Sequence, residues 1–470
     1  MRPISNLVLG LAAAVTLGFA PASLNAQQTQ TKQYENGGIY EGAFRNGKQH
    51  GQGTYTLPNG YEYSGEWVDG NIQGQGSAKF PNGSIYVGVF AKGKPNGKGK
   101  ITFGSGGSYE GDWLDGQITG TGTLMYNTGA VYVGQLRDGL HDGSGKLTEP
   151  TGYIYEGGWV AGTKEGLAQI TYPDKAVYVG EMQRGKRTGQ GVLTMPDGVE
   201  FEGNWIEDQL QGKGRLKQAN GDIYEGDFVA GRREGSGRVL YANGDVYEGD
   251  FKNDRRNGTG TFTGTDGYIY LGDWKDGIIE GNGRVTYPDG SVYTGEFSGD
   301  LAEGKGKIVY KDGNTYDGDW LSGVIEGTGK AVYTNGLIYE GGFKNARNHG
   351  FGVMTYSDGY RYEGNWVNGQ RSGEGVATYA DGTVYTGTFS EGQRDGQGEI
   401  IMPDGFRYKG RWVQGQIDGT GVATYANGDV YEGTFVGGKR QGPGTMRYAS
   451  GEIASGTWEN GALSDASAAN

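Results

Sequence analysis

The sequence predicts an all-β fold: an elongated single-layer antiparallel sheet of stacked 23-residue β-hairpin repeats, twisted or curled. Two observations predict it. From Tyr40 onward one pattern returns every 23 residues without insertion or deletion, giving eighteen full units and a truncated one from Ala454. Each unit also carries aromatic residues, glycines and a turn signal at fixed places. Such a period indicates a repeat array, whose stability comes from contacts between neighbouring units.

With Tyr40 as position 1, position 3 is always glycine and position 5 is a large apolar residue such as Phe44 or Trp67. Positions 1, 3 and 5 share one strand face because side chains alternate. Positions 12 to 14 bring the chain back, and positions 16 and 18 are often apolar and aromatic, as in Ile308 and Tyr310. A single-layer sheet covers its apolar face only by twisting and curling into a trough. Glycine at position 3 lets aromatic rings lie against the backbone.

The connection between units reads as a bulged turn. Proline, then Asp or Asn, then glycine suits a three-residue hairpin loop that ends on a left-handed residue. Glycine fills position 21 in every full unit except the one with Lys175. The bulge places positions 16 and 18 on the same face as positions 1 and 5 of the next unit. Seven of the 11 prolines occupy position 19: Pro58, Pro81, Pro150, Pro173, Pro196, Pro288 and Pro403.

Tyr109–Trp113 (YEGDW), followed by Gly116, Gly120 and Gly122, resembles the MORN (membrane occupation and recognition nexus) repeat. The resemblance covers residues 40 to about 463. It implies one β-hairpin per repeat, stacked into an elongated sheet, and a role in scaffolding, dimerisation, or lipid or protein binding. The family is functionally diverse, so the resemblance predicts an architecture more firmly than a function.

The expected domains are a signal peptide over 1–26, a linker over 27–39, the array over 40–463 and a tail over 464–470. Arg2, an apolar run from Leu7 to Ala20 and small residues after it are typical of a secretory signal peptide, cleaved after Ala22 or Ala26. The alternative is a retained membrane anchor, for which the run is short. We therefore expect an exported, periplasmic or extracellular protein of bacterial type.

All nine tryptophans stand at position 5 in alternate repeats, with one slip where Phe228 and Phe251 fall in adjacent units. This slip suggests a seam between two halves of the array. Position 10 alternates with them, aliphatic in most tryptophan repeats and arginine in several others. Two explanations remain open: packing around rings of different size, with the loop of the smaller ring solvated, or a row of basic loops that binds an anionic partner. The candidate basic loops are Lys186, Arg187, Arg232, Arg233, Arg255, Arg256, Arg394, Lys439 and Arg440.

The aromatic face has no other sequence to cover it, and apolar stripes of that length mark interfaces. We therefore expect it to bind a protein partner or a second copy of the chain. The candidate residues on this face are Tyr109, Trp113, Tyr224, Phe228, Tyr247, Phe251, Tyr270, Trp274, Tyr316, Trp320, Tyr362 and Trp366.

Composition and spacing exclude several classes of function. A net charge of −13 argues against a duplex nucleic-acid partner, and the lack of cysteine excludes disulfides and thiolate metal sites. The three histidines, His50, His141 and His349, are expected to be solvated loop residues. The many Asp-Gly pairs lack the spacing of a calcium loop, and no unique polar cluster interrupts the repeat. We expect no enzyme, cofactor or metal.

The resulting hypothesis is an exported, non-enzymatic repeat scaffold that binds a protein or itself through the aromatic face. Two alternatives are peripheral binding to anionic lipid or envelope polymer through the basic loops, and carbohydrate binding on the aromatic stripe. The sequence does not name the partner.

Overall fold

The computed structural model describes residues 29–466. Its strands fall into two compact units, Met1–Lys186 and Arg187–Asn470, called units 1 and 2 below. Phe228 and Phe251 both lie within unit 2, so the boundary is not at the slip in the tryptophan alternation. The expected signal peptide and its cleavage sites lie outside the described residues. No helix long and apolar enough to cross a membrane is present among the residues described.

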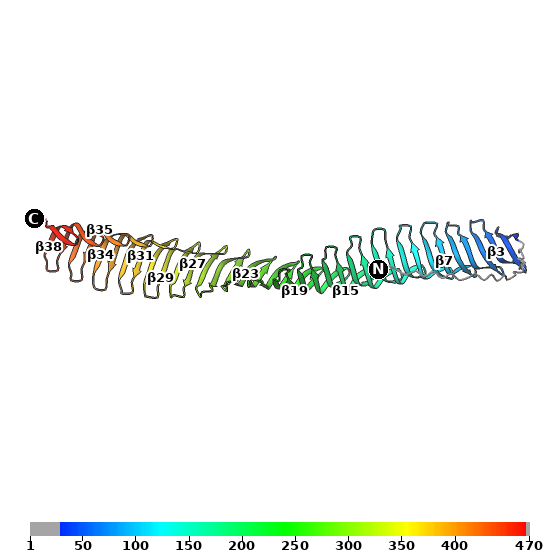
Figure 1. Cartoon of the computed structure of the whole chain (residues 1–470), viewed down its shortest axis with the longest axis horizontal. Helices are drawn as coiled ribbons and strands as arrows, with labels where there is room; N and C mark the ends of the chain where they lie inside the picture. Colours follow the sequence, from blue (N-terminus) through cyan, green and yellow to red (C-terminus); the bar gives the residue numbers. More distant parts are fainter. Residues whose placement is uncertain (1–28, 467–470) are drawn as a thin grey trace, which may run out of the picture. The chain divides into compact units, whose positions relative to one another are not determined.

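Unit 1 is an antiparallel sheet whose strands pair in chain order (Figure 1). Its strands are β1 (Gln30–Gln33), β2 (Ile39–Arg45), β3 (Lys48–Thr56), β4 (Glu62–Val68), β5 (Asn71–Lys79), β6 (Ile85–Ala91), β7 (Lys94–Thr102), β8 (Ser108–Leu114), β9 (Gln117–Met125), β10 (Val131–Arg137), β11 (Leu140–Thr148), β12 (Ile154–Val160), β13 (Thr163–Thr171) and β14 (Val177–Gln183).

Unit 2 repeats the same arrangement. Its strands are β15 (Lys186–Thr194, with Lys186 still in unit 1), β16 (Glu200–Ile206), β17 (Gln209–Lys217), β18 (Ile223–Val229), β19 (Arg232–Leu240), β20 (Val246–Lys252), β21 (Arg255–Thr263), β22 (Ile269–Lys275), β23 (Ile278–Thr286), β24 (Val292–Ser298), β25 (Leu301–Val309), β26 (Thr315–Leu321), β27 (Val324–Val332), β28 (Ile338–Lys344), β29 (Arg347–Thr355), β30 (Arg361–Val367), β31 (Gln370–Thr378), β32 (Val384–Ser390), β33 (Gln393–Ile401), β34 (Arg407–Val413), β35 (Gln416–Thr424), β36 (Val430–Val436), β37 (Lys439–Arg447), β38 (Ile453–Glu459) and β39 (Ala462–Ala466).

Two expected boundaries are wrong. Residues 30–33, expected in a polar linker, form β1 and pair with β2. Residues 464–466, expected in the tail, belong to β39. In both places the chain retains enough of the repeat to add a short strand to the sheet.

The predicted connection between repeats is confirmed. The amide of Leu57 donates to the carbonyl of Tyr61 at 2.8 Å, and the amide of Gly60 donates to the carbonyl of Leu57 at 3.0 Å. Gly60 has a φ of 88°, the left-handed conformation that closes a three-residue hairpin loop. Even the exceptional Lys175 adopts it, with a φ of 76°.

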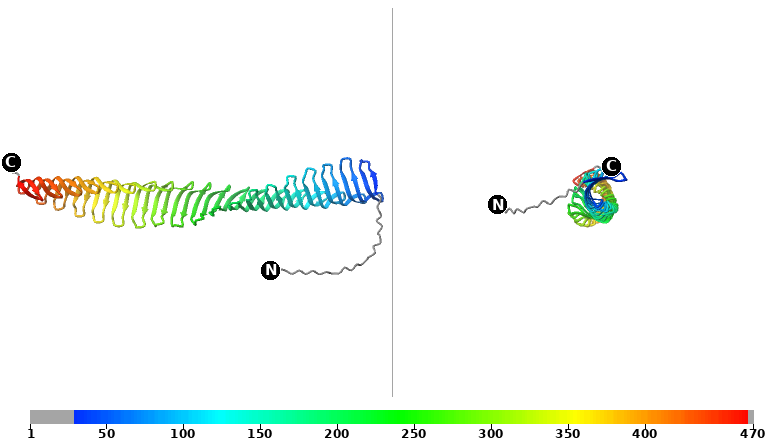
Figure 2. Two further views of the ribbon diagram at one scale, coloured as in Figure 1. Left: turned by 45° about the horizontal axis from the view of Figure 1, so that its top comes forward. Right: turned by 90° about the vertical axis from the view of Figure 1, so that its right-hand side faces the viewer.

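The hairpin within each repeat turns more tightly. Asn46 and Gly47 have φ of 51° and 74°, as a two-residue type I′ turn requires. Beyond this turn the register shifts between Gly42 and Phe44, so each hairpin carries a bulge. Bulges bend a strand and increase its twist. Figure 2 shows the hairpins of each unit arched rather than flat.

The register places the aromatic positions on one face, as predicted. Tyr55, at position 16, lies opposite Tyr40 in its own repeat and opposite Tyr63 in the next. The rings lie over the glycines of positions 3 and 14, which pair directly, as Gly42 does with Gly53. A Cβ on Gly53 would lie 2.3 Å from the Tyr40 hydroxyl. The glycines therefore make room for the rings against the backbone.

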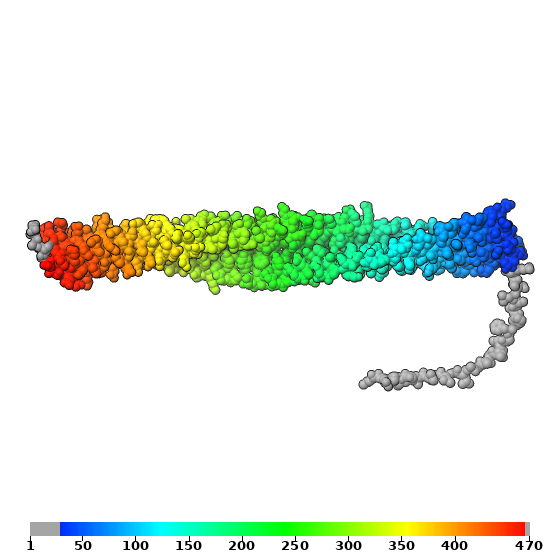
Figure 3. All heavy atoms as spheres, turned by 90° about the horizontal axis from the view of Figure 1, so that it is seen from above, coloured from blue at the N-terminus to red at the C-terminus, as the bar shows by residue number. Residues whose placement is uncertain are grey.

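The opposite face is polar and carries ion pairs between neighbouring strands. Lys100 lies 3.2 Å from Glu110, and Arg238 lies 2.9 Å from Glu248. Each pair joins position 15 to position 2 of the next repeat. Exposed pairs of this kind contribute less than about 1 kcal/mol each, so they favour the register and solubility more than stability. On the face shown in Figure 3, side chains cover the sheet of each unit closely.

Candidate functional site

The predicted aromatic face is a core and not an open surface. All twelve of its candidate residues are between 0 and 9% exposed: Tyr109, Trp113, Tyr224, Phe228, Tyr247, Phe251, Tyr270, Trp274, Tyr316, Trp320, Tyr362 and Trp366. The expectation that these side chains stand free to bind a partner is therefore wrong.

The rings bury one another. Tyr86 contacts Phe90 of its own repeat and Trp113 of the next, both edge to face with centroids 5.0 Å apart. This pattern recurs in most repeats of both units and makes a ladder of rings, in which Leu136 and Met182 take the place of a position 5 ring in two repeats of unit 1. Edge-to-face pairs stabilise beyond the area they bury. Curling brings the rings of this single layer close enough to cover each other.

The polar atoms of the ladder are also satisfied. The hydroxyl of Tyr109 donates to the carbonyl of Asp112 at 3.0 Å, and the indole Nε1 of Trp113 donates to the carbonyl of Gly99 at 3.1 Å. Burial is the main cause that raises the pKa of Tyr109 to about 12. The Tyr109 hydroxyl therefore stays neutral near neutral pH.

The position 10 arginines are structural, which corrects the second expectation. The guanidinium of Arg187 lies 4.4 Å from the Trp205 centroid, and that of Arg394 lies 4.3 Å from the Trp412 centroid. Arg233 lies 5.5 Å from the Phe251 centroid. These arginines are half-buried, and each donates from Nη2 to a carbonyl at position 8 of the next repeat. Arg187, Arg233, Arg256, Arg394 and Arg440 share this arrangement.

The position 9 residues of the basic loops stay exposed: Lys186, Arg232, Arg255 and Lys439. Arg232 contacts Asn253 at 3.4 Å. A row of paired basic side chains directed at an anionic partner is therefore not formed. Packing, the first explanation left open by the sequence, accounts for the alternation at position 10, although the smaller-ring loops are not simply solvated as that explanation supposed.

His141 takes the place of such an arginine and is not a solvated loop residue. Its ring stacks on Tyr132 at 3.6 Å and lies edge-on to Trp159 at 4.5 Å. Its Nε2 lies 2.8 Å from the Tyr126 hydroxyl. Burial lowers the pKa of His141 to about 4. In the described part of the chain, no three His, Asp or Glu side chains gather to hold a metal ion.

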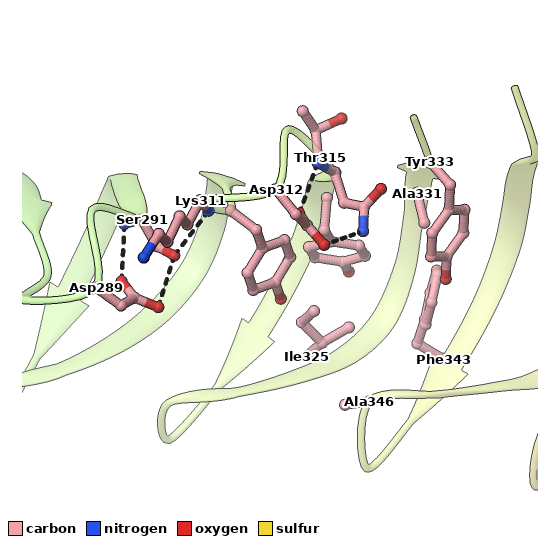
Figure 4. A pocket seen from close by; sticks show the side chains of 13 residues that line it. Asp289, Ser291, Lys311, Asp312, Thr315, Ile325, Ala331, Tyr333, Phe343 and Ala346 are labelled. Carbon is pink, nitrogen blue, oxygen red and sulfur yellow. Dashed lines mark hydrogen bonds between the residues drawn. The ribbon is translucent and has the colours of Figure 1, made fainter. Parts of the chain in front are cut away.

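A groove in unit 2 is the best candidate for a binding site (Figure 4). It has a volume of about 710 Å³ and lies between β23 and β29. Its lining includes Tyr310 and Tyr333, both at position 18, and Ile325 at position 10. Tyr310 is 37% exposed, in contrast to the buried ladder. The buried side chains of Tyr316, Ala331 and Phe343 complete its apolar lining.

The rim of this groove consists of interrepeat turns. Asp289 accepts hydrogen bonds from the amide and the hydroxyl of Ser291, at 2.8 and 3.0 Å. These bonds lower the pKa of Asp289. The Ser291 hydroxyl in turn accepts from the amide of Lys311 at 3.2 Å (Figure 4). The rim is thus preorganised, and Asp289 is ionised at neutral pH. Burial raises the pKa of Tyr310, which keeps its hydroxyl as a neutral donor and acceptor.

The same groove recurs in two other places in unit 2. One, of about 570 Å³, is lined by Tyr241, Phe262 and Arg256. The other, of about 660 Å³, is lined by Tyr425, Met446 and Arg440. In both, positions 18, 16 and 10 contribute as they do around Tyr310. Sequence reasoning placed position 18 on the aromatic face but did not select it, because only curvature distinguishes it from positions 1 and 5.

A search of curated proteins finds no match to this chain. Among solved structures, the chain is similar to the SAS-4 (dCPAP) TCP domain of Drosophila melanogaster in complex with a proline-rich motif of Ana2 (dSTIL), at 12% identity, covering 43% of this chain and 90% of that one, with a TM-score of 0.21. It is also similar to the TCP10 domain of Danio rerio CPAP, at 13% identity, 57% and 99% coverage, and a TM-score of 0.14. PorZ of Porphyromonas gingivalis matches at 10% identity, 86% and 72% coverage, and a TM-score of 0.14. Likeness at this level carries no argument about function.

The comparison with protein-family models is decisive for the family. The MORN repeat model matches residues 40–60, 63–85, 86–108, 109–131, 132–152, 155–177, 178–200, 201–223, 224–246, 247–267, 270–292, 293–315, 316–338, 339–359, 362–384, 385–407, 408–430 and 431–453. These eighteen consecutive matches begin at the position 1 residues of the repeat defined above. The chain belongs to the MORN-repeat family.

Proposed function

We propose that this repeat scaffold binds an extended polypeptide segment along the groove lined by Tyr310 and Tyr333. The observation that carries the proposal is the contrast between two sets of tyrosines. Those at position 1 are buried in the ladder, while Tyr310 remains 37% exposed above a hollow of about 710 Å³. Concave sites with an apolar floor and a few fixed polar groups are typical binding sites.

The spacing between successive position 18 tyrosine rings favours a polyproline II conformation for the bound segment. Two strands per repeat place successive position 18 rings roughly 9–10 Å apart. One turn of polyproline II has three residues and rises roughly 9 Å. One tyrosine would therefore meet each turn of the ligand, packing its ring on a proline and using its hydroxyl for a backbone carbonyl. Aromatic-lined grooves bind this conformation because its ordering costs little entropy.

Charge favours a basic segment. Asp289, Asp312 and Lys311 line the groove, so two carboxylates and one ammonium leave one net negative charge there, and the chain carries a net charge of −13. Complementary charge speeds encounter and selects partners more than it raises affinity. Lysines between the prolines would lie over this rim.

Titration with a twelve-residue peptide of repeated Pro-Pro-Lys tests the proposal. We expect micromolar binding that weakens at least tenfold in a Tyr310→Ala/Tyr333→Ala variant. Phe351→Ala is the matched control, because Phe351 is 59% exposed and lies outside the groove lining. No binding by the unaltered chain, or an equal loss in the control, would contradict the proposal. Binding of cellohexaose in place of the peptide would instead support the carbohydrate alternative.

We also propose that the protein is exported. Arg2 and the apolar run from Leu7 to Ala20 support this, as set out above. Expression of the full gene in a bacterial host, followed by fractionation and N-terminal sequencing, tests it. A mature chain that begins at Ser23 or Gln27 in the periplasmic fraction is the expected result, and an intact N-terminus in the cytoplasm would contradict it.

A further inference from the structure

The outer edge of β2 is only half covered. β1 pairs with the first half of β2, from Gln33 opposite Ile39 to Gln30 opposite Gly42. Among the described residues, no strand pairs with Ala43–Arg45 on that side. Phe44 is half-buried, whereas its position 5 counterparts Phe90 and Phe228 are each 1% exposed. The sheet of unit 1 thus begins with a step.

The outer edge of β38 is half covered in the opposite way. β39 pairs with its second half, from Ala462 opposite Glu459 to Ala466 opposite Gly456. Within residues 29–466, nothing pairs with Ile453–Ser455 on that side. Ile453 is 57% exposed. The sheet of unit 2 thus ends with a complementary step.

The interior repeats show what each step lacks. In the full strand β3, Gly51 lies opposite Trp67 of β4, while Tyr55 and Thr56 lie opposite Tyr63 and Glu62. By repeat position, β39 corresponds to residues 48–52 of this strand and β1 to residues 53–56. The two short strands therefore correspond to the two parts of one repeat strand. They share one place, because Ala466 already lies opposite Gly456, where the interior register puts the position of Gln30, so Gln30 gives way to Ala466 in a joined strand.

We propose that copies of this chain associate head to tail through these two steps. Thr31–Gln33 of one copy pair with residues 453–455 of the next, which no described strand covers on that side. β39 of that copy lies along residues 43–45 of the first, which are likewise uncovered among the described residues. The interior register places Lys32 opposite Ala454 and Gln33 opposite Ile453. Free strand edges pair readily in this way.

Side chains at the two steps fit this pairing. Ala454 stands where eighteen other repeats have an aromatic ring, which leaves room for the long side chain of Lys32. Lys32 is the only charged residue of β1, whereas residues 448–466 carry Glu452, Glu459 and Asp465 and no Lys or Arg. Opposite charges therefore meet at the junction.

Such a contact joins two different surfaces, so it does not close on itself and generates open filaments. It rests on the strand edges and is independent of the groove. Peptide binding and head-to-tail association can therefore fail separately.

Cysteine cross-linking tests the register, because the chain contains no cysteine. Lys32→Cys and Ala454→Cys are made as separate full-length variants and mixed under mild oxidation. We expect a disulfide-linked dimer in the mixture, at least tenfold more than with Lys32→Cys and Glu459→Cys. Glu459 is an exposed residue of the same strand, but its half of β38 is already covered by β39.

Light scattering over a concentration series gives the second readout. The average mass of the unaltered chain should rise with concentration, and Lys32→Glu should shift this rise to at least tenfold higher concentration. β1 is an exposed edge strand, so this variant leaves the array folded. A constant mass of one copy would overturn the proposal. Cross-linking of either single variant with itself, in preference to the mixture, would indicate a two-fold dimer and also overturn it.

Discussion

The guanidinium of Arg256 lies 4.0 Å from the ring centroid of Trp274 in the next repeat. The contact is locked from both sides, because Nη2 of Arg256 donates to the carbonyl of Gly277 at 2.7 Å and the amide of Gly277 donates to the carbonyl of Arg256 at 2.9 Å. Ile279 lies opposite the same indole from within its own repeat. The alternation of tryptophan, arginine and aliphatic residues is therefore a packing scheme that spans two repeats.

Replacing Arg256 by alanine should destabilise the array by about 2 kcal/mol. The change removes a cation–π contact and a hydrogen bond from a charged donor. Lysine keeps the charge but loses the planar stacking and the fixed hydrogen bond, so Arg256→Lys should lose roughly half as much. Urea unfolding measures both. Arg255→Ala, at the neighbouring exposed position, should change the free energy of unfolding by less than about 0.5 kcal/mol. A loss equal to that of Arg256→Ala would contradict a stabilising role for the Arg256–Trp274 contact.

Alanine should be tolerated less well at position 3 than at position 14. A Cβ on Gly111 would lie 2.3 Å from the Tyr109 hydroxyl and 2.6 Å from the Cα of Gly122, and the backbone has no room to yield. Gly111→Ala should therefore cost about 3 kcal/mol. Position 14 already holds Ala168 in another repeat, so Gly122→Ala should cost less. The reverse order in thermal unfolding would refute this account of the glycine pairs.

Lys175→Gly should stabilise the protein. Lys175 has a φ of 76°, a conformation that costs a residue with a Cβ about 1–2 kcal/mol. The hydrogen bond that its backbone amide donates to the carbonyl of Tyr172, at 2.9 Å, survives the change. After the entropy cost of glycine, a gain of about 0.5–1 kcal/mol remains. Thermal unfolding of the variant and of Gly152→Ala, the opposite change in the preceding repeat, gives the comparison; a lower midpoint for Lys175→Gly would contradict it.

Acid should weaken unit 1 through His141. Its pKa falls from an ordinary 6.5 to about 4 because burial disfavours the charged ring. Between pH 6.5 and about 4 the unfolded chain binds a proton at His141 that the folded chain does not. The contribution of His141 to the free energy of unfolding is therefore complete above pH 6.5 and declines as the pH falls towards 4. For this half-buried ring the loss amounts to about 2 kcal/mol.

The His141→Asn variant isolates this effect, because Asn348 occupies position 10 elsewhere. Urea unfolding at pH 7 and pH 4.5 should show a smaller acid loss in the variant than in the unaltered chain. Equal losses would assign the acid sensitivity to other groups.

The sequence was sufficient to predict local structure. The position 19 prolines and the glycines of position 21 predicted the loop around Gly60. A three-residue loop puts position 16 on the same sheet face as position 1 of the next repeat, which correctly placed Tyr55 beside Tyr63. The role of Arg256 could not be predicted, because its partner Trp274 is reached only when the bulge after Gly249 bends the strand. For the same reason, the sequence did not distinguish the buried Tyr316 from the half-exposed Tyr310. Both tyrosines fit the alternation of a strand, and only the curvature of the sheet decides which of them lies in the core and which lines the groove.

The predicted aromatic face is a core, and the groove beside it is the accessible surface. Tryptophan fluorescence distinguishes a core from an open face, since all nine tryptophans occupy position 5. We expect blue-shifted emission and acrylamide quenching far below that of the urea-unfolded chain, and neither should change in the Tyr310→Ala/Tyr333→Ala variant. Red-shifted emission with quenching close to that of the unfolded chain would contradict the buried core.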